Sequence, residues 1–130
     1  MKTSLLLHVN AGDELPIYRQ LVHQVADAIA GGRLDEGDRL PSHRELAVQL
    51  VIAPLTVKKA YDELEREGLI STQRGRGTFV SASIPAPDPQ HARERLRDPA
   101  RRLFSQATLL GVSFTELVEL LKEIRKGMNS

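Results

Sequence analysis

Five basic side chains fall close together in the middle of this sequence: Arg44, Lys58, Lys59, Arg74 and Arg76. Arginine and lysine bind phosphate groups, and they also donate hydrogen bonds to guanine in the major groove of DNA. The net charge of the chain is only +1, which argues mildly against a polyanionic ligand. The distribution of charge matters more than its sum, so the elements that carry these cations decide whether they share one face.

The first of these cations lies at the start of an expected short helix. Ser42 is a favourable N-cap and Glu45 follows three residues later, which together form a capping box. The apolar residues that fall on one face of this helix are Leu46, Ala47 and Leu50. Arg44 is then available to bind DNA, although it can instead pair with Glu45 or another local acid. Ser42 can also reach a phosphate through the N-terminus of the helix.

A longer helix follows a short apolar connection, residues 51–53. Pro54 suits its first turn because proline has no N–H to lose there, and Gly68 is expected to end it as the C′ residue. Its buried stripe repeats at three and four residues: Val57, Ala60, Tyr61 and Leu64. The bases are expected to share one face, and the acids near the end of this helix are expected to point elsewhere: Asp62, Glu63, Glu65 and Glu67.

The N-terminal part of this longer helix combines apolar, hydroxyl and basic side chains. Leu55 and Lys59 are expected on the face opposite the core, with Thr56 and Lys58 flanking it. This composition suits insertion into a major groove, where Leu55 or Thr56 meets a thymine methyl group and the lysines meet phosphate or guanine. The alternative is a solvated helix face without a ligand.

A hairpin with a basic tip completes the pattern. Residues 69–72 and 78–80 are strand-like, and the turn between them contains Arg74, Gly75 and Arg76. Such a hairpin is either an ordinary glycine turn with exposed charge or a wing that places arginine near a minor groove, where the negative potential attracts it. A helix-turn-helix followed by a β-hairpin wing is a DNA-binding arrangement.

Residues 10–81 are expected to form one domain around this motif. Residues 4–9 form either a short strand or an extended arm. Pro16 starts a helix that Gly31-Gly32 ends, and its apolar face contains Ile17, Leu21, Val25, Ala28 and Ile29. Residues 33–41 are expected to form a charged loop. Three helices and a hairpin are enough to enclose one small core.

A separate helical module is expected at the C-terminus, residues 90–130, after a proline-rich linker over residues 82–89. Asp98-Pro99 is expected to restart or kink its first helix, and Ser113 begins a second helix with another capping box. About 40 residues cannot bury a core alone, so the apolar side chains need a partner surface. We expect a second copy of the module, which gives a homodimer through Leu103, Phe104, Ala107, Leu110, Phe114, Leu117, Val118, Leu121 and Ile124.

Catalytic and membrane functions find little support in the sequence. The chain has no cysteine, which excludes disulfides and thiolate metal sites. No pair of histidines has metal-ligand spacing on one helix face, and no nucleophile motif such as G-x-S-x-G occurs. We therefore expect neither an enzyme nor a bound metal or cofactor. Without a long apolar run or a signal peptide, the protein is expected in the cytoplasm and not in a membrane.

Four segments between Pro16 and Val80 resemble the GntR family of bacterial winged-helix transcription regulators. In chain order they are PIYRQL, GDRLPSHRELA, TVKKAYDELEREGLI and RGRGTFV. The short tail, together with the run PLTV that begins at Pro54, resembles the YtrA-like subfamily, in which a winged helix is joined to a small two-helix dimerisation module. The resemblance implies a mainly α fold with a small β-hairpin, in which a winged helix-turn-helix precedes a short two-helix dimerisation module.

The function implied by this resemblance is repression of transcription. A homodimer would bind double-stranded operator DNA at an inverted repeat and occlude the promoter. By the family's pattern, the DNA contacts would be Arg44, Thr56, Lys58, Arg74 and Gly75. The chain departs from that pattern at three positions: many members have glycine at Val51, a Ser or Thr cap at Ala53 and, outside this subfamily, arginine at Pro54. Pro54 cannot read a base by a hydrogen bond.

Two other functions are compatible with a winged helix. A protein-interaction module would need an apolar or acidic surface at the second helix of the motif, and Lys58, Lys59 and Arg74 argue against one. A ligand-sensing regulator would need a pocket, and the tail is too short for an obvious one. Any small-molecule effector would therefore have to bind at the dimer interface.

Overall fold

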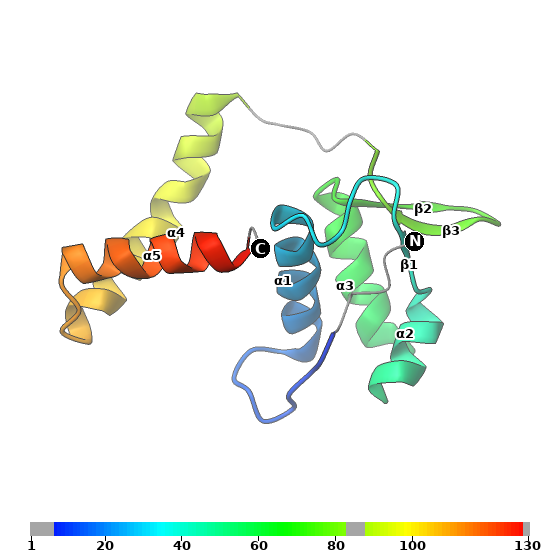
Figure 1. Cartoon of the computed structure of the whole chain (residues 1–130). Helices are drawn as coiled ribbons and strands as arrows, with labels where there is room; N and C mark the ends of the chain where they lie inside the picture. Colours follow the sequence, from blue (N-terminus) through cyan, green and yellow to red (C-terminus); the bar gives the residue numbers. More distant parts are fainter. Residues whose placement is uncertain (1–6, 83–87, 129–130) are drawn as a thin grey trace. The chain divides into compact units, whose positions relative to one another are not determined.

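The computed structural model describes residues 7–82 and 88–128 of the chain. The chain forms two compact units, residues 1–84 and 85–130. As predicted, the fold is mainly helical with one small antiparallel sheet (Figure 1). The first unit contains α1 (Ile17–Ala30), β1 (Arg39–Leu40), α2 (His43–Leu50), α3 (Pro54–Arg66), β2 (Ile70–Gln73) and β3 (Gly77–Val80). The second unit contains α4 (Pro89–Leu109) and α5 (Phe114–Met128).

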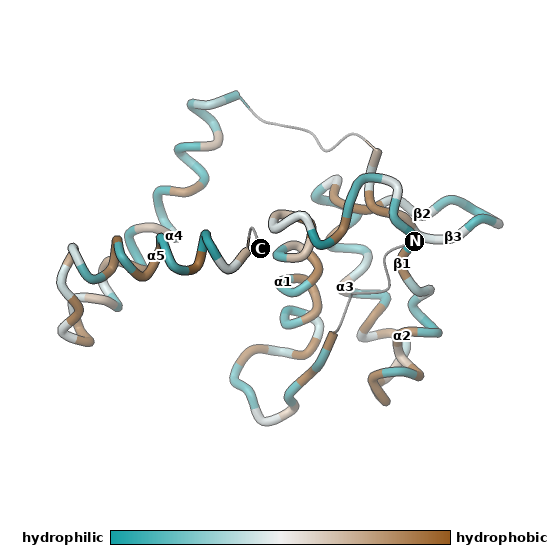
Figure 2. The backbone as a smooth tube through the Cα atoms, in the orientation of Figure 1, coloured by the Kyte–Doolittle hydropathy of each residue, from teal (hydrophilic) through white to brown (hydrophobic). Residues whose placement is uncertain are grey.

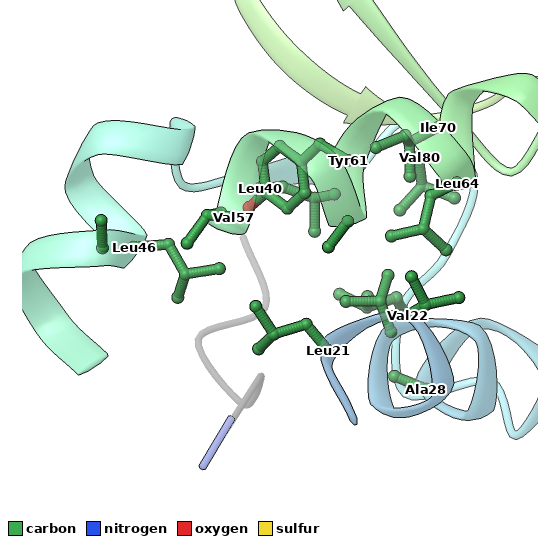
Figure 3. Close-up of a cluster of buried hydrophobic side chains, with 14 residues drawn as sticks. Leu21, Val22, Ala28, Leu40, Leu46, Val57, Tyr61, Leu64, Ile70 and Val80 are labelled. Atoms are coloured by element: carbon green, nitrogen blue, oxygen red, sulfur yellow. The ribbon is translucent and has the colours of Figure 1, made fainter. Parts of the chain in front are cut away.

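The core of the first unit lies between α1, α2, α3 and the sheet. All four residues of the stripe predicted on α3 are buried: Val57, Ala60, Tyr61 and Leu64. They belong to one cluster with side chains from α1, β1, α2 and the hairpin: Leu21, Val22, Ala28, Leu40, Leu46, Ile70 and Val80. Figure 3 shows this cluster, with Val57, Tyr61 and Leu64 of α3 labelled. Because burying one such aliphatic side chain contributes roughly 1.5–3 kcal/mol, this shared core holds the three helices and the sheet in one arrangement.

The ends of the helix-turn-helix follow the capping chemistry predicted from the sequence. Ser42 Oγ accepts the Glu45 N–H at 3.0 Å, and Glu45 Oε1 accepts the Ser42 N–H at 3.3 Å, which confirms the capping box. Gly68 has φ 79°. The N–H groups of Gly68 and Leu69 donate to carbonyl oxygens of the last turn of α3, both at 3.0 Å. This is the Schellman arrangement, and it turns the chain directly into β2.

Residues 33–41, which were expected to form a loop, contain a short strand. β1 pairs with β3 in antiparallel register, with Arg39 opposite Phe79 and Leu40 opposite Thr78. The hairpin is therefore part of a three-stranded sheet of order β1-β3-β2. The loop prediction was wrong here because a strand of two residues is too short to show an alternating pattern.

The segment before α1 is held by two glutamine side chains. Gln20 Nε2 donates to the Asn10 carbonyl oxygen, and Gln20 Oε1 accepts the Asn10 N–H, both at 2.9 Å. One turn later, Gln24 exchanges a similar pair of bonds with the backbone of His8. This backbone therefore finds its partners in side chains and forms no strand. The rest of the expected strand or arm, residues 1–6, lies outside the described residues.

The first helix of the second unit is longer than predicted. α4 is continuous through Pro99, so the helix is not restarted there. Pro89 was expected in the linker, but it is the first residue of α4, and Asp88 is the N-cap. Proline is tolerated in that first turn because its missing N–H has no partner in the helix. Residues 83–87 of the expected linker lie outside the described residues.

The second unit buries little within itself. Gly111, with φ 75°, follows α4, and Ser113 and Glu116 form the second predicted capping box at the start of α5. Among the described residues of this unit, only Ala107 and Leu117 are buried. The two helices therefore leave most of their apolar side chains exposed in a single copy of the chain.

Candidate nucleic-acid interface

Pro41 is the point where the sheet, α2 and α3 meet. It directly follows β1 and precedes Ser42, the N-cap of α2. The hydroxyl of Tyr61 on α3 donates to the Pro41 carbonyl oxygen at 2.7 Å. Burial raises the pKa of the Tyr61 hydroxyl above its ordinary value, and the negative charge of Glu45 raises it further. The start of α2 is thereby held against α3.

The first turn of α2 presents two of the predicted contact residues. Ser42 Oγ accepts the Glu45 N–H, but its own hydroxyl proton can still be donated to a phosphate. Arg44 is exposed. The alternative ion pair between Arg44 and a local acid is not formed within the described residues. The guanidinium is therefore available for a ligand.

The N-terminal end of α3 offers few hydrogen-bonding groups. Ala53 is the N-cap and makes no side-chain cap bond, and Pro54 follows it without an N–H. Leu55 is 77% exposed. Thr56 is half-buried and carries the one hydroxyl of the first turn. This end of the helix therefore presents an apolar surface with a single hydroxyl beside it.

The two lysines of α3 point in different directions. Lys58 Nζ lies 2.9 Å from Asp62 Oδ2, and both side chains are exposed. Such a surface pair contributes only about 0.3–0.5 kcal/mol, so a phosphate can replace the carboxylate. Lys59 Nζ lies 4.0 Å from the ring centroid of Tyr18 on α1. Lys59 is exposed, and its ammonium group lies on the α1 side of α3.

Acidic residues of α3 find partners inside the unit. Glu63 Oε1 lies 3.4 Å from Arg19 Nη1 on α1. Glu65 Oε2 accepts the Thr72 N–H at 3.0 Å, which directs this carboxylate toward β2. These two carboxylates point toward α1 and β2. They therefore repel a polyanion at the N-terminal half of α3 less than exposed carboxylates would.

The wing tip exposes Arg74 and Arg76 on either side of Gly75. The Arg76 N–H donates to the Gln73 carbonyl oxygen at 2.9 Å, which closes a turn in which Gly75 has φ 77°. Any residue with a Cβ would be strained at that position. Arg76 also lines a hollow of about 340 Å³ beside Phe79. Figure 1 shows the β2–β3 turn extending away from the helices of its unit.

Arg39, at the base of the wing, is a cation that the sequence reasoning missed. It is exposed on β1. A Cβ atom on Gly77 would lie only 3.1 Å from Arg39 Nε, so this side chain covers the backbone of β3. A strand of two residues gave no sequence signal that could have identified Arg39. The strand adds a positive charge between the start of α2 and the wing.

The residues predicted to mediate dimerisation all lie in the second unit. Ala107 and Leu117 are buried within the unit, and Val118 is half-buried. The others are exposed: Leu103, Phe104, Leu110, Phe114, Leu121 and Ile124. The rings of Phe104 and Phe114 have centroids 6.3 Å apart and are tilted by 52°, so α4 and α5 share an aromatic pair at the surface.

The first unit therefore carries the chemistry of phosphate and base-edge contact. Its cations lie on α2, α3, β1 and the wing, beside the apolar end of α3. The described residues contain no cluster of three His, Asp or Glu side chains that could hold a metal ion. None of the helices in these residues has the length and apolar character needed to cross a membrane.

Comparison with known proteins gives consistent matches. The family model for bacterial regulatory proteins of the gntR family matches residues 17–80. The HTH-type transcriptional repressor YtrA of Bacillus subtilis (strain 168) is 37% identical over 119 residues, which cover 92% of this chain and 92% of the relative.

Two solved structures show the same fold. A transcriptional antiterminator from Listeria monocytogenes EGD-e has a TM-score of 0.83 at 32% identity and covers 96% of this chain and 93% of its own. AraR(DBD), which was solved in complex with operator ORX1, has a TM-score of 0.54 at 29% identity. That match covers 58% of this chain and 96% of AraR(DBD).

Proposed function

Because the chain belongs to the gntR family of bacterial regulatory proteins and is a DNA-binding transcription regulator, with no enzymatic role, we propose that it acts as a homodimeric repressor. The dimer binds double-stranded operator DNA at an inverted repeat and occludes the promoter, in the cytoplasm where the chromosome lies. The observation that carries this proposal is the exposed set of cations around the N-terminal end of α3. The similar YtrA is a repressor by name, and the similar AraR(DBD) was solved on an operator.

The predicted contact residues take distinct roles in this proposal. Ser42 and Arg44 bind a phosphate beside the groove, because Ser42 is the half-buried N-cap of α2 and Arg44 is exposed in its first turn. The N-terminal part of α3 enters the major groove with Leu55 and Thr56, and Lys58 exchanges Asp62 for a phosphate or a base.

Two further groups of contacts flank the groove. Lys59, held over the Tyr18 ring, reaches a phosphate on the α1 side of α3. The wing presents Arg74 and Arg76 to the minor groove or its phosphates, and Gly75 between them lets the backbone approach closely.

The second unit supplies the two-fold symmetry. Leu117, Leu121 and Ile124 follow a helical spacing of three to four residues along α5; Leu117 is buried within the unit, whereas Leu121 and Ile124 are exposed. Such a stripe, with Phe104 and Phe114 beside it, is too apolar to remain in water and matches itself in a second copy. We propose that residues 90–130 are the dimerisation module and that residues 10–81 are the DNA-binding domain.

A salt titration tests DNA binding. The affinity of the full-length protein for a random duplex should fall steeply with salt, and Lys59→Ala should lower the slope by about 0.9 per subunit for one lost phosphate contact. Arg33→Ala is the matched control, because Arg33 is an exposed cation in the loop after α1, outside the proposed surface. A slope that changes equally in both variants would contradict the assignment of Lys59.

Sedimentation tests the assembly. The full-length protein should sediment as a dimer at micromolar concentration. Leu121→Glu should give monomers, because a carboxylate buried in an apolar interface without a partner is costly. Glu116→Gln changes a charge at the start of the same helix and should leave the dimer intact. A wild-type monomer would overturn the homodimer.

A further inference from the structure

An apolar patch adjoins the N-terminal end of α3. It consists of Val48, Val51 and Leu55, whose exposed fractions are 78%, 88% and 77%. Figure 2 shows the hydrophobic colouring of the chain at the end of α2, where it turns into α3.

Cations border the patch on both sides: Arg44 precedes Val48 by four residues on α2, and Lys58 follows Leu55 by three residues on α3. An apolar surface between cations matches a nucleic-acid groove, whose floor contains base edges and whose rims are phosphates.

Val51 is held in a conformation that does not favour valine. It has φ 56° and ψ 52°, in the left-handed region. The Val51 N–H donates to the Val48 carbonyl oxygen at 3.3 Å, and the Ile52 N–H donates to the Ala47 carbonyl oxygen at 3.0 Å. These two bonds form a Schellman motif with Val51 at the position that glycine usually occupies. A β-branched residue is strained there.

The strain at Val51 is not offset by packing within its unit. Its side chain is almost fully exposed, whereas the next residue, Ile52, packs against the core. Neither the backbone nor the core therefore favours valine over glycine at this position. Strain of this kind points to a use of the side chain outside the chain itself.

We propose that Val51 and Leu55 read thymine methyl groups in the major groove, so that the operator half-site carries thymine beneath the start of α3. This inference rests on the proposed DNA-binding function. Ala53 and Pro54, between the two residues, offer no side-chain donor and no proline N–H. The C5-methyl group of thymine is the apolar feature of the major groove, and uracil lacks only that group.

The experiment begins with selection of an operator. A pool of duplexes with a random central segment is enriched with the full-length protein. Each thymine of the enriched operator is then replaced singly by deoxyuridine, which removes the methyl group and keeps the hydrogen-bonding edge. At one or two positions in each half-site, wild-type affinity should fall by about fourfold, the factor that corresponds to about 0.8 kcal/mol for one buried methyl-sized group.

The variants connect those positions to the patch. Leu55→Ala should bind the thymine operator more weakly and lose its sensitivity to deoxyuridine at one of the positions. Val51→Gly should lose sensitivity at the same or a neighbouring position while melting at a higher temperature, because glycine relieves the strain. A more stable variant with weaker binding cannot be explained by unfolding. Leu109→Ala is the control for the deoxyuridine effect alone, because Leu109 is an exposed leucine of the other unit, at 86%, in the proposed dimerisation module. Whatever its effect on overall affinity, it should keep the sensitivity to deoxyuridine.

Each outcome has one meaning. Loss of the deoxyuridine effect in Leu55→Ala or Val51→Gly, but not in Leu109→Ala, supports the inference. If replacing each thymine leaves the affinity unchanged, the inference is overturned and the proposed function stays intact. The apolar patch would then be available for a protein partner. Failure to enrich any duplex overturns both the inference and the proposed function.

Discussion

The hydroxyl of Tyr61 donates to the carbonyl oxygen of Pro41 at 2.7 Å, across 20 residues of sequence. This bond joins the middle of α3 to the junction between β1 and α2. The elements that carry Arg44, the α3 N-terminus and the base of the wing are therefore tied together at one backbone carbonyl. The relative position of these elements therefore depends on a hydrogen bond within the first unit.

Tyr61→Phe should destabilise the first unit by about 1 kcal/mol at neutral pH, the usual net contribution of one hydrogen bond. Burial raises the pKa of Tyr61 in the folded protein above its ordinary value of 10.0. Folding therefore favours the neutral phenol, so this stabilisation is complete below pH 10 and is lost as the pH rises above that value. Urea unfolding at pH 7 and above pH 10 should show the wild type losing more stability than the variant.

The Tyr18→Phe variant controls for the loss of a tyrosine hydroxyl. An equal loss of stability between the two pH values in the wild type and in Tyr61→Phe would contradict the prediction.

Ala53→Ser should stabilise the first unit by about 1 kcal/mol, because Ala53 is an N-cap without a side-chain acceptor and serine can accept an N–H of the first turn of α3. Thermal unfolding measures the gain. Ala53→Val adds volume without an acceptor and should give no increase. If the two variants melt at the same temperature, the N-terminal N–H groups of α3 are already satisfied by water.

Asp62→Asn should increase affinity for random DNA, because it releases Lys58 from a carboxylate 2.9 Å away and removes a negative charge near the phosphates. Lys58→Ala should have the opposite effect and lower the salt slope by about 0.9 per subunit. Glu67→Gln, at the far end of α3, is the matched control for removal of a charge. Identical affinities of Asp62→Asn and wild type would place Lys58 away from the DNA backbone.

Arg74→Ala should leave the fold intact, because the wing tip buries no apolar residue, and should weaken operator binding by roughly 1–3 kcal/mol. The loss should be larger on operators with A·T-rich flanks, whose narrow minor groove concentrates negative potential. Arg74→Lys should recover only part of it, since ammonium is more strongly hydrated than guanidinium. Binding isotherms at one salt concentration on two operators that differ only in their flanks make the comparison. Equal affinity of wild type and Arg74→Ala on both would show that the wing does not contact DNA.

A chain that ends at Ala82 should fold and be monomeric, because the buried cluster of the first unit lies entirely within residues 21–80. Circular dichroism and thermal unfolding check the fold, and sedimentation checks the mass. Operator affinity should fall steeply, since each monomer then binds a half-site without its partner. A dimer of the shortened chain would move the interface to the first unit.

Local patterns alone determined most of the helices and the wing. The capping box at Ser42, the buried stripe of α3, the Schellman turn at Gly68 and the glycine turn at the wing tip each depend on residues within one or two turns of one another. These features could be predicted from the sequence for that reason. The resemblance to the family was carried by the sequence motifs on these elements, from PIYRQL to RGRGTFV.

Contacts between distant segments were decided only by the tertiary structure. β1 exists because Arg39 and Leu40 meet β3, and Lys59 faces α1 because Tyr18 lies there. The left-handed backbone of Val51 lies directly before Ile52, which packs against the core. Two-residue strands, cation–π pairs and strained turns carry almost no periodic signal, since their energy comes from partners that the neighbouring sequence does not contain.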